Sequence, residues 1–506
     1  MATPKEILAV KRPKNTVVVT YGKNRNLYAV RKRIGCHRVN GRNLPVTGPT
    51  VGHIVGGKYV ALAAARPTVA AVGATIDLKD WANVALCERL FSDMLEELHK
   101  VYRPEDALKF YCIAVLRVCY PGVRDYELAE RYEGSFLSVL RPGAALSRNT
   151  VSTFIKNAGK SCGMIVQFMR RRAAAVCAAG DHVLVDGTLK TDTSTVNSLS
   201  DFSRKARTKG SRDISVLQAF DLEKMEPVCS KCFPGNMLDA TAYGDFIREC
   251  GVRDGILVGD KGFPSAAVKG PVGESVALHY LNPVKRNSQL VGAYGLLRFE
   301  GKLPAREGVV YKKAKCVSGD EVKWLYSYRD VRMAANEERG YLERLAPKDY
   351  EADAYAKKRD SFGTIVLESD LDLPPETAYG AYEDRWMIEI VMRFYKSACE
   401  FDDTRVHSDY SVIGSEFCDF LATVLTWRLI RAFTKSKLLD KLTYRRIMTF
   451  LRRAKMARVG DGGWQSVKVA PAVEKSLAAL GLDPKTVSAA RAADKRARAE
   501  NPQSAE

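Results

Sequence analysis

Two short stretches of the chain, residues 182–187 (HVLVDG) and residues 255–260 (GILVGD), decide its fold. Each is an apolar run that ends in an aspartate with a glycine directly beside it. Continuous apolar runs of this length are typical of strands buried on both faces of a sheet. A single aspartate after such a run is most often a turn residue, but side chains at the carboxyl ends of neighbouring strands face one crevice. The two stretches therefore predict a buried sheet with Asp186 and Asp260 at the same edge.

The segments between and after these stretches complete an α/β core. Residues 182–187, ISVLQAFD and MEPVCSKCF together predict one strand followed by a hairpin, and an amphipathic helix follows over 239–250. Strand, strand, strand, helix, strand is the order of an RNase H-like core, and ALHYLNPVKRN adds a further strand. We therefore predict an α/β fold with an RNase H-like mixed sheet.

The region before the core has helical periodicity from about residue 78 to residue 178. Within it, residues 125–160 predict two short helices joined by a turn that contains Pro142 and Gly143, with Ser147 as N-cap of the second helix. This pattern is compatible with a helix-turn-helix, and equally with a helical hairpin that never touches DNA. In the DNA-binding interpretation the groove-facing side chains are Arg148, Asn149, Thr150 and Ser152.

The region after the core begins with a polar, turn-rich and partly β-like segment over about 297–370, followed by a strong helix from Pro375 onward. In YEDRWMIEIVMRFYK, helical spacing predicts one charged face and an opposite apolar face. A carboxylate flanked by cations on such a face suits a metal ion held next to a phosphate, although an exposed helix with surface ion pairs gives the same pattern. The charged face comprises Tyr382, Arg385, Glu389, Arg393 and Lys396.

The net charge of +20 is concentrated at the two ends of the chain. Residues 1–60 and residues 428–506 each carry about +11, whereas the middle is nearly neutral. Nucleic acid is the simplest partner for two basic flanks, because neither flank opens with a long amphipathic membrane anchor. Ordinary solubilising surface charge is the alternative for either flank alone.

Other features of the sequence exclude several classes of protein. No stretch is apolar enough to span a membrane, and the first residues lack the apolar core of a signal peptide. Twelve scattered cysteines indicate a reducing compartment, and the single C-x-x-C pair, Cys229 and Cys232, has no partners for a zinc site. The P-loop, H-E-x-x-H and G-x-S-x-G motifs are absent, which removes nucleotide-driven motors, zincins and α/β-hydrolases.

The spacing Y-x2-R-x3-E-x6-K, met by Tyr382, Arg385, Glu389 and Lys396, resembles the Y-R-E-K signature of bacterial insertion-sequence transposases of the DDE superfamily, in the group named after insertion sequence four. The D-G-T at Asp186 and the D-x-G-F at Asp260 are similar to the first and second acids of that family. LNPVKRN at residues 281–287 resembles the strand after the second acid, and the resemblance covers roughly residues 181–433.

The resemblance implies a DNA transposase that cleaves and transfers strands at the ends of a mobile element. It assigns Asp186, Asp260 and Glu389 to two Mg²⁺ ions, for which Mn²⁺ can substitute, and Tyr382, Arg385, Lys396 and Arg393 to the DNA backbone. Paired metals of this kind activate a nucleophile and stabilise the leaving oxygen in an in-line displacement at phosphorus. Trp324, in VKWLYSYRD, is a candidate for stacking on a base, and a core role is the more common one for such a residue.

The sequence thus predicts a basic β-like arm over 1–70, a helical DNA-binding domain over 71–178, a catalytic domain over 179–433 with its insertion at about 297–370, and a basic helical region over 434–506. The expected partners are double-stranded DNA, as transposon ends and target, and a second copy of the chain in the DNA complex, without a membrane. The expected location is cytoplasmic and nucleoid-associated. Two alternatives stay open, a catalytically silent DNA-binding protein derived from a transposase and an RNase H-like DNA nuclease.

Overall fold

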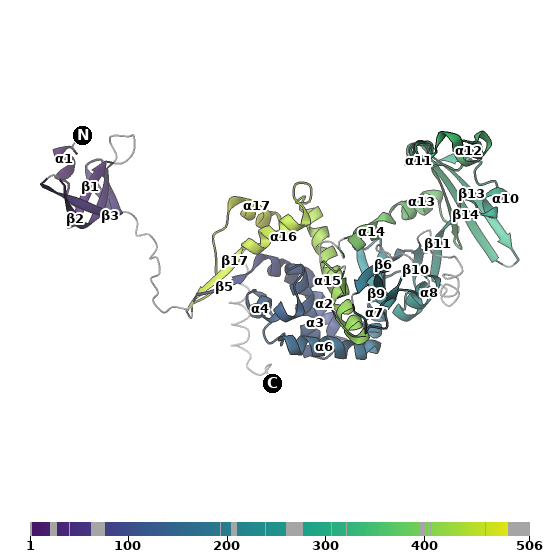
Figure 1. Ribbon diagram of the computed structural model, residues 1–506, viewed down its shortest axis with the longest axis horizontal. Coiled ribbons are helices and arrows are strands. Elements are labelled where there is room, and N and C mark those ends of the chain that lie inside the picture. The colour runs from purple at the N-terminus through teal and green to yellow at the C-terminus, as the bar shows by residue number, and fades with distance from the viewer. Residues whose placement is uncertain are drawn as a thin grey trace. The chain divides into compact units, whose positions relative to one another are not determined.

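The chain divides into two compact units, Met1–Ile76 and Asp77–Glu506 (Figure 1). The helical, catalytic and C-terminal segments that we expected as separate domains all fall within the second unit. The computed structural model describes residues 3–20, 28–39, 41–61, 76–192, 194–203, 210–237, 239–259, 277–304, 306–319, 321–393, 396, 400–401, 403–404, 406–460 and 462–483.

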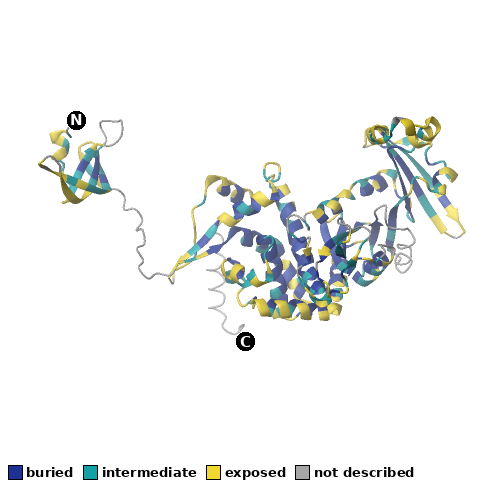
Figure 2. Ribbon diagram, in the orientation of Figure 1, coloured by how far each residue is buried: buried dark blue, intermediate teal, exposed yellow. Residues whose placement is uncertain are grey.

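The first unit is a four-stranded antiparallel sheet in the order β1-β2-β3-β4 with one short helix, α1 (Lys5–Leu8). Its apolar centre is small, formed by the buried side chains of Val18, Val30 and Ile54. Gly52 lies so close to the ring of Tyr59 that a side chain there would clash. Figure 2 shows that exposed residues line much of this sheet. The strands are β1 (Thr16–Thr20), β2 (Tyr28–Val39), β3 (Arg42–Val55) and β4 (Lys58–Ala61).

The second unit is built on a mixed sheet. Its central strands lie in the order β9-β8-β6-β10-β11, with the first three antiparallel and the last two parallel to β6. Along the chain the order is strand, strand, strand, helix, strand, strand, which confirms the predicted succession, and the helix matches the predicted 239–250. These elements are β6 (His182–Asp192), β8 (Arg212–Asp221), β9 (Glu226–Pro234), α8 (Asp239–Cys250), β10 (Gly255–Val258) and β11 (Leu278–Val284).

An antiparallel extension continues this sheet beyond β11. Strand β15 pairs with β11 on one side and with β14 on the other, and β14 pairs with β13. The turn-rich segment predicted over about 297–370 is therefore partly β, and it also contains helices that the sequence pattern did not predict. The extension comprises α10 (Gln289–Ala293), β12 (Gly301–Lys302), β13 (Val309–Ser318), β14 (Glu321–Asp330), α11 (Val331–Arg344), α12 (Ala352–Arg359) and β15 (Thr364–Ser369).

A long helix, α15 (Asp409–Lys435), lies between the helical region and the sheet (Figure 1). It packs against α3 and α6 on one side and against β9 on the other, and most of its side chains are buried. Gly159 of α6 and Gly414 of α15 allow the two backbones to approach closely. The helical region contains α2 (Ala82–His99), α3 (Pro104–Cys119), α4 (Leu128–Glu133), α5 (Leu137–Leu140), α6 (Arg148–Lys160) and α7 (Cys162–Val176).

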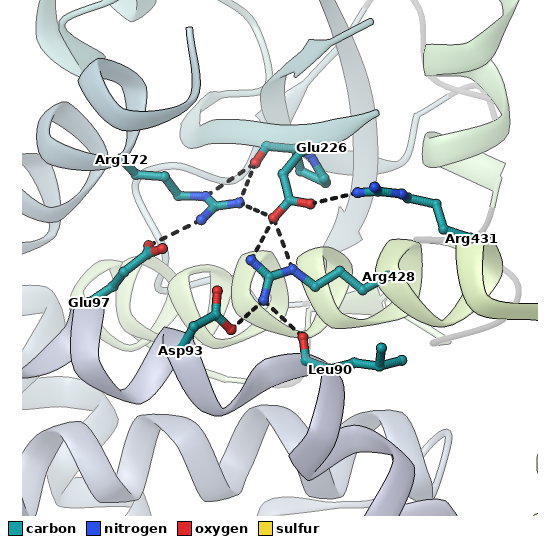
Figure 3. A network of polar contacts seen from close by, with 8 residues as sticks. Leu90, Asp93, Glu97, Arg172, Glu226, Arg428 and Arg431 are labelled. Carbon is teal, nitrogen blue, oxygen red and sulfur yellow. Dashed lines mark hydrogen bonds and ion pairs between the residues drawn. The ribbon is translucent and has the colours of Figure 1, made fainter. Parts of the chain in front are cut away.

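Buried ion pairs fix α15 to its neighbours (Figure 3). Glu226 of β9 accepts hydrogen bonds from Arg172 of α7 and from Arg428 of α15, and Arg428 also pairs with Asp93 of α2 at 2.6 Å. Each buried charge therefore has a partner of opposite sign, which is the condition under which charges are tolerated in an interior. The network joins α2, α7, β9 and α15.

The C-terminal segment folds back onto the helical region. It forms a three-stranded sheet in the order β18-β17-β5 and two helices, so it is not purely helical as predicted. The elements are β5 (Ile76–Asp80), α16 (Tyr444–Arg453), β17 (Lys455–Val459), β18 (Gln465–Ser466) and α17 (Pro471–Ala479). Among the residues that the structure describes, no helix has the length and apolar character needed to traverse a bilayer.

Candidate active site

Asp186 lies within β6 and not at its end. The strand continues to Asp192, because its antiparallel pairing with β8 extends to Thr191. What ends near Asp186 is the buried part of the strand: Val185 is buried, whereas Asp186 is half-buried and Gly187 is exposed. The expectation that the strand would end at this aspartate was wrong. The apolar run in the sequence ends where burial of the strand ends, whereas the pairing of β6 with β8 continues.

The edge of β6 opens beside Asp186. On that edge β10 pairs with β6 only as far as Leu184, and within the described part of the chain strand pairing resumes at Thr191, where β16 (Asp403–Thr404) joins. The interval between these two pairings leaves room for side chains from other elements. Asp186 stands at the start of this interval, and its Oδ1 accepts a hydrogen bond of 2.8 Å from the N–H of Gly187.

Helix α14 (Trp386–Arg393) packs against β6 and carries Glu389. Ile388, Val391 and Met392 are buried on one side of this helix, whereas the Glu389 side chain is 53% exposed. An oxygen of Glu389 lies 3.6 Å from the guanidinium of Arg385. The apolar face thus fixes the helix and leaves the carboxylate exposed, as the predicted two-faced pattern requires.

The helix expected from Pro375 onward is interrupted. It consists of α13 (Pro375–Glu383) and α14, and the backbone between them tightens, with N–H groups of Arg385 and Met387 bonding three residues back. Tyr382 is consequently buried, while the Arg385 guanidinium lies 5.5 Å from its ring centre. The prediction of one continuous helical face was therefore wrong at the junction.

Trp386 is an exposed aromatic residue near this junction. It lies at the first position of α14 and is 52% exposed. A large exposed aromatic beside a proposed phosphate-binding arginine is available to contact a ligand. The amphipathic pattern missed this because the helix starts anew at this position.

The remaining predicted acid, Asp260, lies outside the described residues. Within the described ranges, no cluster of three or more histidine, cysteine, aspartate or glutamate side chains is arranged to hold a metal ion. The two described carboxylates do provide exposed oxygen donors on adjacent elements, and oxygen donors are what Mg²⁺ prefers. The chemistry of these residues is thus suited to a hard divalent cation.

Two residues missed by sequence reasoning share the surroundings of Asp186, one across the sheet and one further along β6. Gln218 of β8 is its direct cross-strand neighbour and is fully buried, and no hydrogen-bond partner for its amide is found among the described residues. Lys190 follows Asp186 at a spacing of four and shares its face of β6. Gln218 could have been singled out from the sequence, because it is a polar residue within an apolar strand. Nothing in the neighbouring sequence singled out Lys190.

Lys190 is buried and belongs to a network of charges. Its ammonium pairs with Glu416 and lies 2.9 Å from Asp419, which in turn accepts from Arg117 at 2.6 Å. Burial alone would lower the pKa of Lys190, but Asp419 and Glu416 outweigh burial and raise it. A cavity of about 390 Å³ adjoins this network and is also lined by Glu400.

Other predicted residues lie on separate elements. Arg148 and Asn149 are exposed at the start of α6, which begins after Ser147 as predicted, although the Ser147 hydroxyl contacts Thr150 and makes no capping bond to the backbone. Trp324 is half-buried in β14, with the ammonium of Lys313 4.8 Å from its ring centre. Arg393 is exposed at the end of α14, and Lys396 is half-buried.

The two cysteines of the C-x-x-C pair lie in β9, and burial raises the pKa of both thiols, that of Cys232 to about 12. The thiolate is the form that binds metal, so burial disfavours a metal site here. This agrees with the interpretation of a strand segment.

Comparison with known proteins bears on the same region. Residues 178–412 match the family described as the transposase DDE domain. This match spans Asp186, Asp260 and Glu389 and supports the prediction of a DDE-superfamily transposase, a class of DNA-cleaving enzymes. No curated protein matches the sequence.

Among solved structures, the chain is similar to a piggyBac transposase in a synaptic complex with hairpin DNA. The identity is 12%, the alignment covers 73% of this chain and 79% of the other, and the TM-score is 0.40. A likeness this slight carries no argument about fold or function.

Proposed function

We propose that this protein is a DDE transposase of the insertion sequence four group, with an RNase H-like core. One observation carries the proposal. Helix α14, which bears Glu389, packs against β6, and both elements lie in the part of the chain that matches the transposase DDE domain. The central strand order β9-β8-β6-β10-β11 supports an RNase H-like core. Asp260 stands two positions after the last residue of β10 in the sequence.

In this proposal Asp186, Asp260 and Glu389 hold two Mg²⁺ ions. Bound there, the ions supply activation of the attacking hydroxyl and stabilisation of the leaving oxygen. The contribution of this chain is to hold the carboxylates in place. The apolar faces of β6 and α14 do so by burial, and the ion pair between Arg385 and Glu389 orients the glutamate.

The remaining predicted residues contact DNA. Arg385, Arg393 and Lys396 are cations beside the proposed metal site, suited to the phosphates next to the cleavage point, and Tyr382 stacks under Arg385. Arg148 and Asn149 lie on the exposed face of α6, where they would enter a groove. Trp324 would contact a base from the inserted strands. Two copies of the chain would pair the two transposon ends.

Cleavage of the DNA that flanks the gene tests the proposal. Purified protein with Mg²⁺ should nick duplexes that carry the terminal repeats, and Asp186→Ala should abolish nicking. Joining of the cleaved ends to a target plasmid separates a transposase from a nuclease that only hydrolyses. Equal products from wild type and Asp186→Ala would reject the enzyme and favour a silent DNA-binding protein.

Binding separates the two groups of residues. Glu389→Gln should abolish nicking and leave binding of the ends nearly unchanged, because it removes a metal ligand. Arg385→Ala combined with Lys396→Ala should weaken binding, because it removes phosphate contacts. Loss of binding that is equal in both variants would contradict these roles.

A further inference from the structure

Helix α16 has a basic face that the proposed catalytic residues do not use. Its sequence, YRRIMTFLRR, contains four arginines and no acidic residue. Residues at spacings of one, seven and eight from the first arginine lie on the same side of a helix. This basic face consists of Arg445, Arg446, Arg452 and Arg453, and all four are exposed.

The opposite face of α16 is fixed in the protein core. Ile447, Phe450 and Leu451 are buried, and the helix packs against α2 and α17. The guanidinium carbons of Arg446 and Arg453 lie 4.7 and 5.8 Å from the ring centre of Phe450. The arginines are therefore held on a rigid element, which reduces the entropy lost when they bind a ligand.

The charge of this face is largely uncompensated. Among the described residues only Arg445 of the four makes an ion pair, to Glu400 at 3.5 Å. A salt-laced surface helix would show acids three or four residues from each base, as α11 does between Arg339 and Glu343. Three clustered arginines without acids create a positive potential suited to a polyanion.

The ion pair to Glu400 connects one end of this face to the cavity beside Lys190. Glu400 lines the cavity that Lys190 adjoins, and Lys190 shares a face of β6 with Asp186, about 13 Å away along the strand. The basic face itself extends about 12 Å along the helix axis, from Arg445 to Arg453.

We propose that the basic face of α16 binds the phosphate backbone of double-stranded DNA. The inference rests on the proposed transposase function and extends it to a surface beyond the proposed catalytic and DNA-binding residues. Arginine suits this role because its planar guanidinium donates two parallel hydrogen bonds to a phosphate. The contact should be independent of base sequence.

The test uses the full-length protein and a labelled random-sequence duplex, with affinity measured against KCl concentration. The variant Arg446→Gln, Arg452→Gln, Arg453→Gln should bind less tightly, with the slope of log K against log salt shallower by up to about 2.7, since each phosphate contact contributes about 0.9. Between 50 and 200 mM salt, this difference in slope means that the wild type loses about 40-fold more affinity than the variant.

Two matched variants control the test. Lysine at the same three positions keeps the charge and should restore most of the slope. Glutamine at Arg332, Arg339 and Arg344 removes equal charge from exposed positions of α11 and should change the slope much less. Thermal melting of every variant verifies folding, because Arg446 and Arg453 cover Phe450.

Several outcomes would overturn the inference. These are an unchanged slope in the glutamine variant, an equal loss in the α11 control, or a lysine variant as weak as the glutamine one, which would indicate packing in place of charge. If phosphatidylserine vesicles retained the wild type as well as DNA does, and did not retain the glutamine variant, the face would be assigned to a membrane. Because the readout is binding, it can succeed even if wild-type protein cleaves nothing, so the two proposals fail separately.

Discussion

Strand β6 carries charged side chains in two different settings, four residues apart. Asp186 is half-buried at the open edge of the sheet, whereas Lys190 is buried and paired with Glu416 and Asp419 from α15. Asp186 is partly accessible to solvent, whereas the buried charge of Lys190 has already exchanged water for counter-ions. The comparison teaches that proximity in the sequence does not decide whether a charge serves chemistry or stability.

The largest effect expected from this contrast is on catalysis. Asp186→Asn should lower the rate of DNA nicking by about 10³-fold or more, roughly 4 kcal/mol in activation free energy, because it removes a proposed metal ligand. The free energy of unfolding should change little, since the side chain is not fully buried. Single-turnover nicking and urea denaturation measure the two quantities.

A matched control for this variant is Glu376→Gln, which removes an exposed carboxylate from α13. It should leave nicking unchanged. Nicking by Asp186→Asn at the wild-type rate, or a loss explained by unfolding, would break the contrast between the two settings.

Lys190→Met should have the opposite profile, with stability as its main effect. It leaves Glu416 and Asp419 buried without this cation, so we expect a loss of about 3–5 kcal/mol in the free energy of unfolding. Replacing Glu416 by leucine in the same protein should recover part of the loss, because an apolar pair needs no counter-ion.

Lys302→Met, at an exposed position of β12, is the control for this loss and should change stability by less than about 0.5 kcal/mol. If Lys190→Met were as stable as wild type, the buried network would not be structural as we infer. Chemical denaturation is the measurement in each case.

A buried acid at the end of β8 sharpens the contrast through pH. Burial raises the pKa of Asp221 to about 6, so the folded state binds a proton that the unfolded state releases above about 4. This group therefore contributes stability at low pH that is lost as pH rises from about 4 to about 6. The contribution is of the order of 1–3 kcal/mol.

Asp221→Asn should remove this dependence, so the stability of the variant relative to wild type should increase across the same pH interval. Denaturation midpoints of both proteins at matched pH values report the difference. A constant difference between pH 4 and pH 6 would show that Asp221 titrates alike in the folded and unfolded chains.

The smallest effect concerns Gln218, the cross-strand neighbour of Asp186. An apolar replacement, Gln218→Leu, should stabilise the fold by about 1 kcal/mol if the amide is unsatisfied, because it removes a buried polar group. If Gln218 also orients Asp186, nicking should slow by about tenfold. A variant that loses stability would show that the amide has partners in the folded protein.

The core could be predicted from the sequence because its signals are local. Apolar runs marked β6 and β10, and helical periodicity marked α8 with the observed bounds. The match of residues 178–412 to the transposase DDE domain supports the prediction of a DDE-superfamily transposase and leaves the spacing Y-x2-R-x3-E-x6-K a prediction. The N-terminal segment that was predicted to be β-like also forms strands.

The site could be predicted only in part. The pattern placed Glu389 opposite an apolar face correctly, yet it missed the junction between α13 and α14 that buries Tyr382 and exposes Trp386. A helical pattern continues through such a junction, because a short tightening of the backbone shifts the face without changing residue spacing.

By itself, the sequence determined the central strands of the sheet and helix α8, where burial ends along β6, and that both flanks are strongly basic. Only the tertiary structure decided that Lys190 would be neutralised by Glu416 and Asp419, and that among the described residues only Arg445 of the four α16 arginines would make an ion pair. The physical reason is that periodicity and burial arise from neighbouring residues. Charge compensation depends on side chains that the fold brings together from distant parts of the chain.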